Sequence, residues 1–116
     1  PSKEELGIFY LNNPIGNQIA FLGSNKSTGG MLSIDNKYGK NVVYIGEGSE
    51  ENGLFILQNK YETPTVSIGS DTEKYAGMID VFNNRGQLVG RLTVVDDEGV
   101  FILLDAKGDI SFGAPN

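Results

Sequence analysis

The chain contains no cysteine and no histidine among its 116 residues. Without cysteine no disulfide can form, and without either residue type the common zinc sites are excluded. The absence of histidine also removes the side chain that most often serves as a general base or activates a nucleophile. We therefore expect no enzyme activity, no catalytic residue, no metal site and no cofactor.

Basic residues are scarce as well. Nine Lys and Arg stand against fifteen Asp and Glu, which gives a net charge of -6. Affinity for nucleic acid comes largely from neutralising phosphates with Lys and Arg, so nucleic acid is not an expected partner. No apolar run approaches the roughly 18 residues that a membrane-spanning helix needs, and we expect no membrane insertion.

Glycine, in contrast, is abundant, with 16 residues, and it marks a repeat. The segment GIFYLNNPIGNQIAFLG begins at Gly7, and GMLSIDNKYGKNVVYIG begins 23 residues later at Gly30. Similar copies begin at Gly53, Gly77 and Gly99, the last one cut short in its second half. A fixed period of this kind is the signature of a repetitive architecture built from one recurring unit.

Each copy holds two short apolar segments rich in Val, Ile, Phe and Tyr. Segments of this length are too short for a 3.6-residue helical pattern and are typical of strands. The sequence therefore predicts an all-β fold with ten strands, at 8–11, 19–22, 31–34, 42–45, 54–57, 65–68, 78–82, 89–92, 100–104 and 110–112.

The two segments of a copy are separated by a turn that begins with Asn or Asp. Glycine follows three residues later in four of the five copies, where it tolerates the positive φ of a tight turn. The third copy has Glu62 in place of this glycine, followed by Pro64. We expect that turn to be wider or irregular.

Alternate residues of a strand point to opposite faces of a sheet. Counted from the leading glycine, the even positions of the first strands are all large and apolar, and those of the second strands are apolar apart from Gly90. These columns predict a continuous core. The odd positions of the first strands are also largely apolar, so we expect another layer to cover Met31, Leu54, Ile56, Met78 and Ile102.

Two apolar faces on one meander favour assembly of several chains. We predict an elongated fibrous β-structure, an intertwined homotrimeric β-helix or prism that grows in length with copy number. The alternative is a monomeric β-solenoid with about one copy per coil. In either case residues 7–113 form the repetitive module, 1–6 are the end of a preceding segment such as a coiled coil, and 114–116 are a tail.

The repeated phrase in GMLSIDNKYGKNVVYIG and GMIDVFNNRGQLVGRLT resembles the short β-repeats of bacteriophage tail fibres and bacterial surface fibres. The resemblance covers roughly residues 6–113. It implies a homotrimeric triple-stranded shaft with a structural or receptor-engaging role, and a location on a virion or at a cell surface. It offers no catalytic residues.

Two groups of side chains invite sharper interpretations. The carboxylates of Asp96, Asp97 and Glu98, with those of residues 47, 50 and 51, could be read as calcium ligands, but they lie in polar connections without a calcium-binding motif, and we expect no metal there. Tyr38 and Tyr61 occupy the same turn position in consecutive copies. They are the candidate ligand-facing ridge, since tyrosine suits contact with sugars and proteins alike.

Two functions of different classes follow. The first is a structural shaft module of a phage tail fibre or cell-surface adhesin that presents or contributes to binding of a cell-surface glycan or protein receptor. The second is a glycan-binding accessory module.

Overall fold

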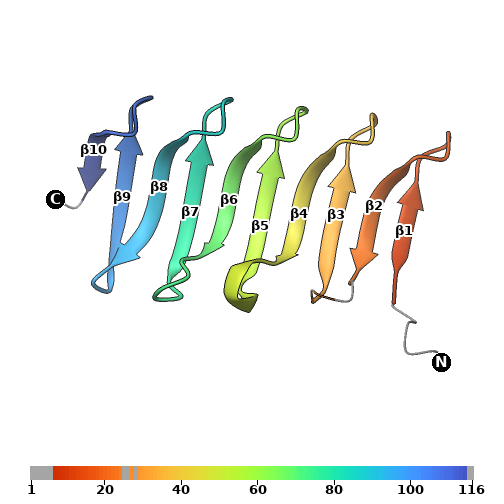
Figure 1. Cartoon of the computed structure of the whole chain (residues 1–116), viewed down its shortest axis with the longest axis horizontal. Coiled ribbons are helices and arrows are strands. Elements are labelled where there is room, and N and C mark those ends of the chain that lie inside the picture. The colour runs from red at the N-terminus through yellow and green to blue at the C-terminus, as the bar shows by residue number, and fades with distance from the viewer. Residues whose placement is uncertain (1–6, 25–26, 28, 115–116) are drawn as a thin grey trace.

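The computed structural model of the chain describes residues 7–24, 27 and 29–114. They form one open antiparallel sheet whose ten strands follow each other in chain order (Figure 1). The strands are β1 (Phe9–Asn12), β2 (Gln18–Gly23), β3 (Met31–Asp35), β4 (Asn41–Glu47), β5 (Gly53–Gln58), β6 (Pro64–Ser70), β7 (Gly77–Phe82), β8 (Leu88–Val95), β9 (Glu98–Leu104) and β10 (Ile110–Ala114).

Each predicted strand overlaps one of these ten, so the all-β prediction is confirmed. Within the described residues the only helical segment is a short 3-10 turn, η1 (Ser49–Glu51), between β4 and β5. The segment expected to end a coiled coil, 1–6, lies outside the described residues.

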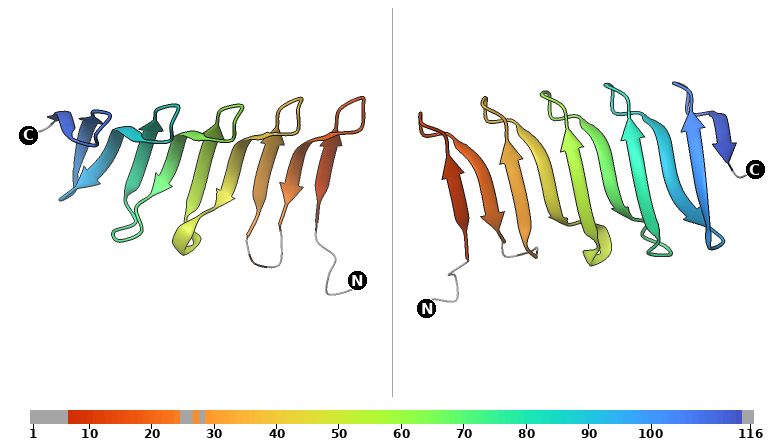
Figure 2. Two further views of the ribbon diagram at one scale, coloured as in Figure 1. Left: turned by 45° about the horizontal axis from the view of Figure 1, so that its top comes forward. Right: turned by 180° about the vertical axis from the view of Figure 1, so that it is seen from behind.

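The sheet is a single layer with extents of 55 × 31 × 17 Å. Its strands run across the long dimension, and β1 and β10 lie at opposite ends (Figures 1 and 2). Every copy of the repeat forms a hairpin that pairs with the next hairpin along the chain. The molecule is therefore a strip in which each copy contacts only its neighbours.

The Asn-led turns follow from local hydrogen bonding. In the second copy the Asn36 side-chain oxygen accepts hydrogen bonds from the backbone N–H groups of Tyr38 at 2.9 Å and Lys40 at 3.1 Å. Gly39 closes this turn at a φ of 78°, a left-handed conformation that suits glycine because it lacks a Cβ. The same bonds recur at Asn13, Asn59, Asn83 and Asp105.

The prediction of an irregular third turn is wrong. Glu62 adopts a φ of 62° and takes the place of glycine. Its N–H donates to the Asn59 carbonyl at 2.9 Å, the distance found between Gly39 and Asn36 in the second copy. The hydrogen bonds that the Asn59 side-chain oxygen accepts hold the turn in its common shape, and Glu62 adopts the strained backbone conformation.

The predicted core is open on one side. No hydrophobic side chain of the described residues is fully buried. The even columns do line one face continuously, but a one-layer sheet has nothing to pack against that face. A closed core requires a second surface.

Candidate interaction surfaces

The face lined by the even columns, called here the apolar face, consists of two rows that cross all ten strands. Strand pairing fixes the first row as Phe9, Leu22, Leu32, Ile45, Phe55, Ile68, Ile79, Leu92, Phe101 and Ala114. The second row is Leu11, Ala20, Ile34, Val43, Leu57, Val66, Val81, Gly90, Leu103 and Phe112. Neither row contains a polar or charged side chain.

These rows are exposed to an extent that is unusual for apolar side chains. Phe9 is 58% exposed, Leu22 53% and Leu92 48%. The strip spans most of the 55 Å length of the molecule. Soluble monomers rarely expose contiguous apolar patches of more than a few hundred Å². This face is the principal candidate for an interaction surface.

The opposite face is less apolar than the first strands alone predicted. Paired second strands contribute Gly23, Gly46 and Gly69 to it, each beside a large apolar side chain of a first strand. A Cβ on Gly46 would lie 3.0 Å from the Cβ of Met31, so this glycine makes room for its neighbour. Met31, Leu54, Ile56, Met78 and Ile102 are half-buried against their own sheet. The need for cover is therefore greater on the apolar face.

An ion pair lies on this opposite face between β7 and β8. Arg91 donates from Nε to Asp80 Oδ1 at 2.7 Å and from Nη2 to Asp80 Oδ2 at 2.8 Å. Asp80 is only 5% exposed, and the hydrogen bond to Asp80 raises the pKa of Arg91. The patterns within single strands did not predict this pair. Hairpin register could have found it, because residues 79 and 92 face each other and residues 80 and 91 must then do so too.

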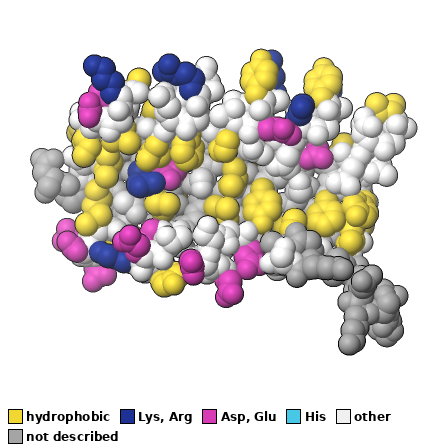
Figure 3. Space-filling view, in the orientation of Figure 1, with side chains coloured by type: hydrophobic (Ala, Val, Ile, Leu, Met, Phe, Trp, Pro, Cys, Tyr) yellow, Lys and Arg dark blue, Asp and Glu magenta, His cyan; other side chains and the backbone are white. Residues whose placement is uncertain are grey.

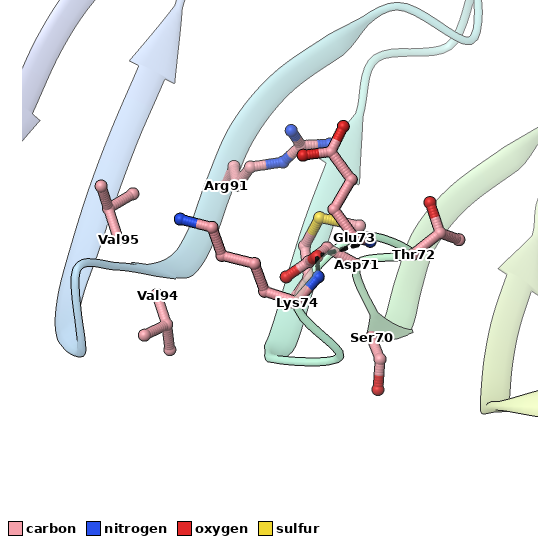
Figure 4. Close-up of a pocket in the computed structure, with 9 residues that line it drawn as sticks. Ser70, Asp71, Thr72, Glu73, Lys74, Arg91, Val94 and Val95 are labelled. Carbon is pink, nitrogen blue, oxygen red and sulfur yellow. Dashed lines mark hydrogen bonds between the residues drawn. The ribbon is translucent and has the colours of Figure 1, made fainter.

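Beside this pair lies an open hollow of about 400 Å³ (Figure 4). Glu73 and Lys74 reach into it from the β6–β7 loop, and Val94 and Val95 form its other side. The Asp71 carboxylate accepts backbone hydrogen bonds from Lys74 at 2.7 Å and Glu73 at 3.0 Å, and the bond from Lys74 is the main cause that lowers the pKa of Asp71. These bonds fix the loop itself.

A second hollow, of about 300 Å³, interrupts the apolar face at Gly90. Its walls include Val81, Phe101 and Leu103. A Cβ on Gly90 would lie 3.7 Å from Leu103 and 3.8 Å from Val81, which is ordinary van der Waals contact. Packing within the chain therefore leaves room for a larger residue at this position.

Tyr38 and Tyr61 lie at the tips of two turns on the same edge of the sheet, as the repeat predicted. Each is 75% exposed. Lys37 Nζ lies 5.0 Å from the ring centroid of Tyr38, and Lys60 Nζ lies 5.1 Å from that of Tyr61, so each turn presents a similar cation and ring. A ligand for this ridge stays a prediction.

Charged side chains gather along the two long margins of the sheet, with a band of hydrophobic side chains between them (Figure 3). Lys and Arg lie along the margin that holds the Asn-led turns, together with some Asp and Glu, whereas Asp and Glu predominate on the other margin. Among the described residues, no group of three or more carboxylates lies close enough together to hold a metal ion. In the same residues no helix is long and apolar enough to cross a membrane.

Comparison with protein-family models gives no match for this chain, and comparison with curated proteins gives none either.

Proposed function

We propose that the chain is a structural shaft module of an elongated homo-oligomeric fibre, in which apolar faces of three copies pack around a common axis. The observation that carries this proposal is the pair of apolar rows, which contain no polar side chain and which no part of the described chain covers. Burying apolar surface stabilises an assembly by about 25 cal/mol per Å². A face of ten strands offers a large source of that stabilisation.

The proposed number of chains and the proposed location of the fibre rest on the sequence resemblance to phage tail fibres and bacterial surface fibres. We propose a trimer located on a virion or at a cell surface, where it presents or supports a receptor-binding part. Antiparallel pairing of consecutive strands favours the walls of a prism over a solenoid, whose coils stack parallel strands.

Sedimentation analysis combined with light scattering tests the assembly. We expect an elongated particle of three 12.5 kDa chains. Ile68→Lys places a charge on the apolar face and should dissociate the particle, whereas Ser67→Lys, on the opposite face of the same strand and across from Asp80, should leave it assembled. A folded wild-type monomer across the measured concentrations would overturn the proposal.

A second candidate function, glycan binding, is favoured by the 75% exposure of Tyr38 and Tyr61 together with their stacked lysines. Sites repeated along a fibre would bind weakly one at a time and strongly together. Replacing both tyrosines with Ala should reduce attachment to glycan-coated surfaces or cells while sedimentation stays unchanged. Equal attachment by the variant would leave the module as a passive spacer.

A further inference from the structure

The two long edges of the sheet carry different charge. We call the side with the five Asn- or Asp-led turns the turn edge and the side with the other connections the loop edge. Described residues of the loop edge include eight carboxylates and one lysine, a net of -7, at Glu47, Glu50, Glu51, Asp71, Glu73, Lys74, Asp96, Asp97 and Glu98. The turn edge has five cations and four carboxylates, a net of +1, at Asp35, Lys37, Lys40, Lys60, Glu62, Arg85, Asp105, Lys107 and Asp109.

The carboxylates of the turn edge are partly engaged within their own chain. Asp105 accepts backbone hydrogen bonds from Lys107 and Asp109, and Glu62 accepts one from the Asn41 N–H at 3.1 Å. In contrast, the only ion pair found among the described residues joins Arg91 and Asp80. The cations of the turn edge therefore form no ion pair with a described carboxylate of the same chain.

If chains pack through their apolar faces, as the proposed function requires, the symmetry of the assembly decides which edges meet. Chains that run in the same direction around an axis along the strip place the turn edge of one chain beside the loop edge of the next. Chains that run in opposite directions, related by a two-fold axis along the strands, place loop edge against loop edge. That contact would bring together two edges whose described residues each carry a net charge of -7, and like charges within about 10 Å of each other repel.

From this charge complementarity we infer that the occupant of the apolar face is a second copy of this chain running parallel to the first, with the turn edge of each copy beside the loop edge of the next. Lys60 and its counterparts then lie beside carboxylates such as those of Glu51 and Glu73. This inference rests on the proposed assembly and adds its direction and its contacting edges.

The absence of cysteine makes cross-linking a direct test. Tyr61 and Glu73 lie at about the same level of the strip, in the β5–β6 turn and the β6–β7 loop. The double variant Tyr61→Cys/Glu73→Cys, treated with a short bifunctional maleimide, should yield covalently closed oligomers. Each single variant should stay almost entirely uncoupled, since like edges lie apart in a parallel ring. Circular dichroism checks that the variants remain folded.

Each outcome separates the two proposals. Efficient coupling of Tyr61→Cys or Glu73→Cys to itself, in a particle that still sediments as an oligomer, overturns the parallel arrangement. It also rules out three chains around one axis, which necessarily run parallel, and leaves only association through the apolar faces standing. If the double variant remains an oligomer but fails to couple, the contact between the turn edge of one chain and the loop edge of the next is contradicted. A wild-type chain that sediments as a monomer removes the assembly itself.

Charge reversal gives a second measurement that does not depend on cysteine. Lys60→Glu should weaken the assembly, by up to about fivefold in dissociation constant for one exposed pair. Adding Glu73→Lys should recover the affinity. If the double variant Lys60→Glu/Glu73→Lys assembles more weakly than either single variant, these edges do not face each other.

Discussion

At the scale of single residues, the turns are set by side-chain oxygens more than by glycine. Asn59 makes the same backbone contacts as Asn36, although one turn closes with Glu62 and the other with Gly39. The sequence-based prediction failed here because it gave the glycine decisive weight. A non-glycine residue in the left-handed region costs roughly 1 to 2 kcal/mol, which a hydrogen-bonded turn can absorb.

Replacing Glu62 with Gly should therefore stabilise the fold, by up to about 1 kcal/mol, since loss of its hydrogen bond to Asn41 offsets part of the gain. The matched change Gly39→Ala should destabilise it by about 1 kcal/mol. Urea denaturation at fixed protein concentration measures both. A loss of stability in Glu62→Gly as large as that in Gly39→Ala would mean that the bond to Asn41 outweighs the backbone strain.

At the scale of strands and hairpins, the period of two predicted most of what was found. It placed Leu32 and Ile34 on one face with Val43 and Ile45, and strand pairing confirms that these four lie together. The period of two did not predict the contacts between strands, because it describes each strand alone. The space that Gly46 leaves for Met31 depends on the register between hairpins, which no single-strand pattern contains.

The candidate site was predicted less completely than the fold. Tyr38 and Tyr61 were placed correctly because they depend only on the repeat. Arg91 was missed, and so was the segregation of charge between the two edges. Both depend on knowing which connections share an edge, and that requires the alternating direction of the strands.

The pairing of β7 with β8 provides a test of how an ion pair is tolerated on a thin sheet. In the third copy the facing residues are Ile56 and Ser67, where the fourth copy has Asp80 and Arg91. Arg91→Ser leaves a carboxylate that is 5% exposed without its partner and should destabilise the fold by about 1 to 3 kcal/mol. Combining it with Asp80→Ile should return the stability close to wild type.

Denaturant titrations of the single and double variants decide this, with the midpoint as the readout. A double variant less stable than Arg91→Ser would show that the ion pair supplies net stability that an apolar pair cannot replace.

At the scale of the whole molecule, stability depends on what covers the apolar face. In the proposed trimer Leu32 lies in the shared core, and a buried Leu→Ala change costs about 2 to 5 kcal/mol. Because the change occurs in every chain, its effect on the assembly should be about three times that on one copy. Leu32→Ala should lower the melting midpoint strongly, and Ser67→Ala on the other face should lower it little.

The midpoint of both variants should also rise with protein concentration, as it does when unfolding is coupled to dissociation. An unchanged midpoint for Leu32→Ala would place Leu32 outside any shared core.

The strands lie across the long dimension of the sheet, and this arrangement determines how the protein would respond to tension. A pull along the 55 Å axis loads the hydrogen-bond ladders between neighbouring strands one after another, because each strand is joined only to the next. Releasing one hairpin of about 23 residues would lengthen the chain by roughly 70 Å, given the reach of an extended backbone. A shaft of this kind would yield in steps and absorb mechanical work while the remaining hairpins keep their structure.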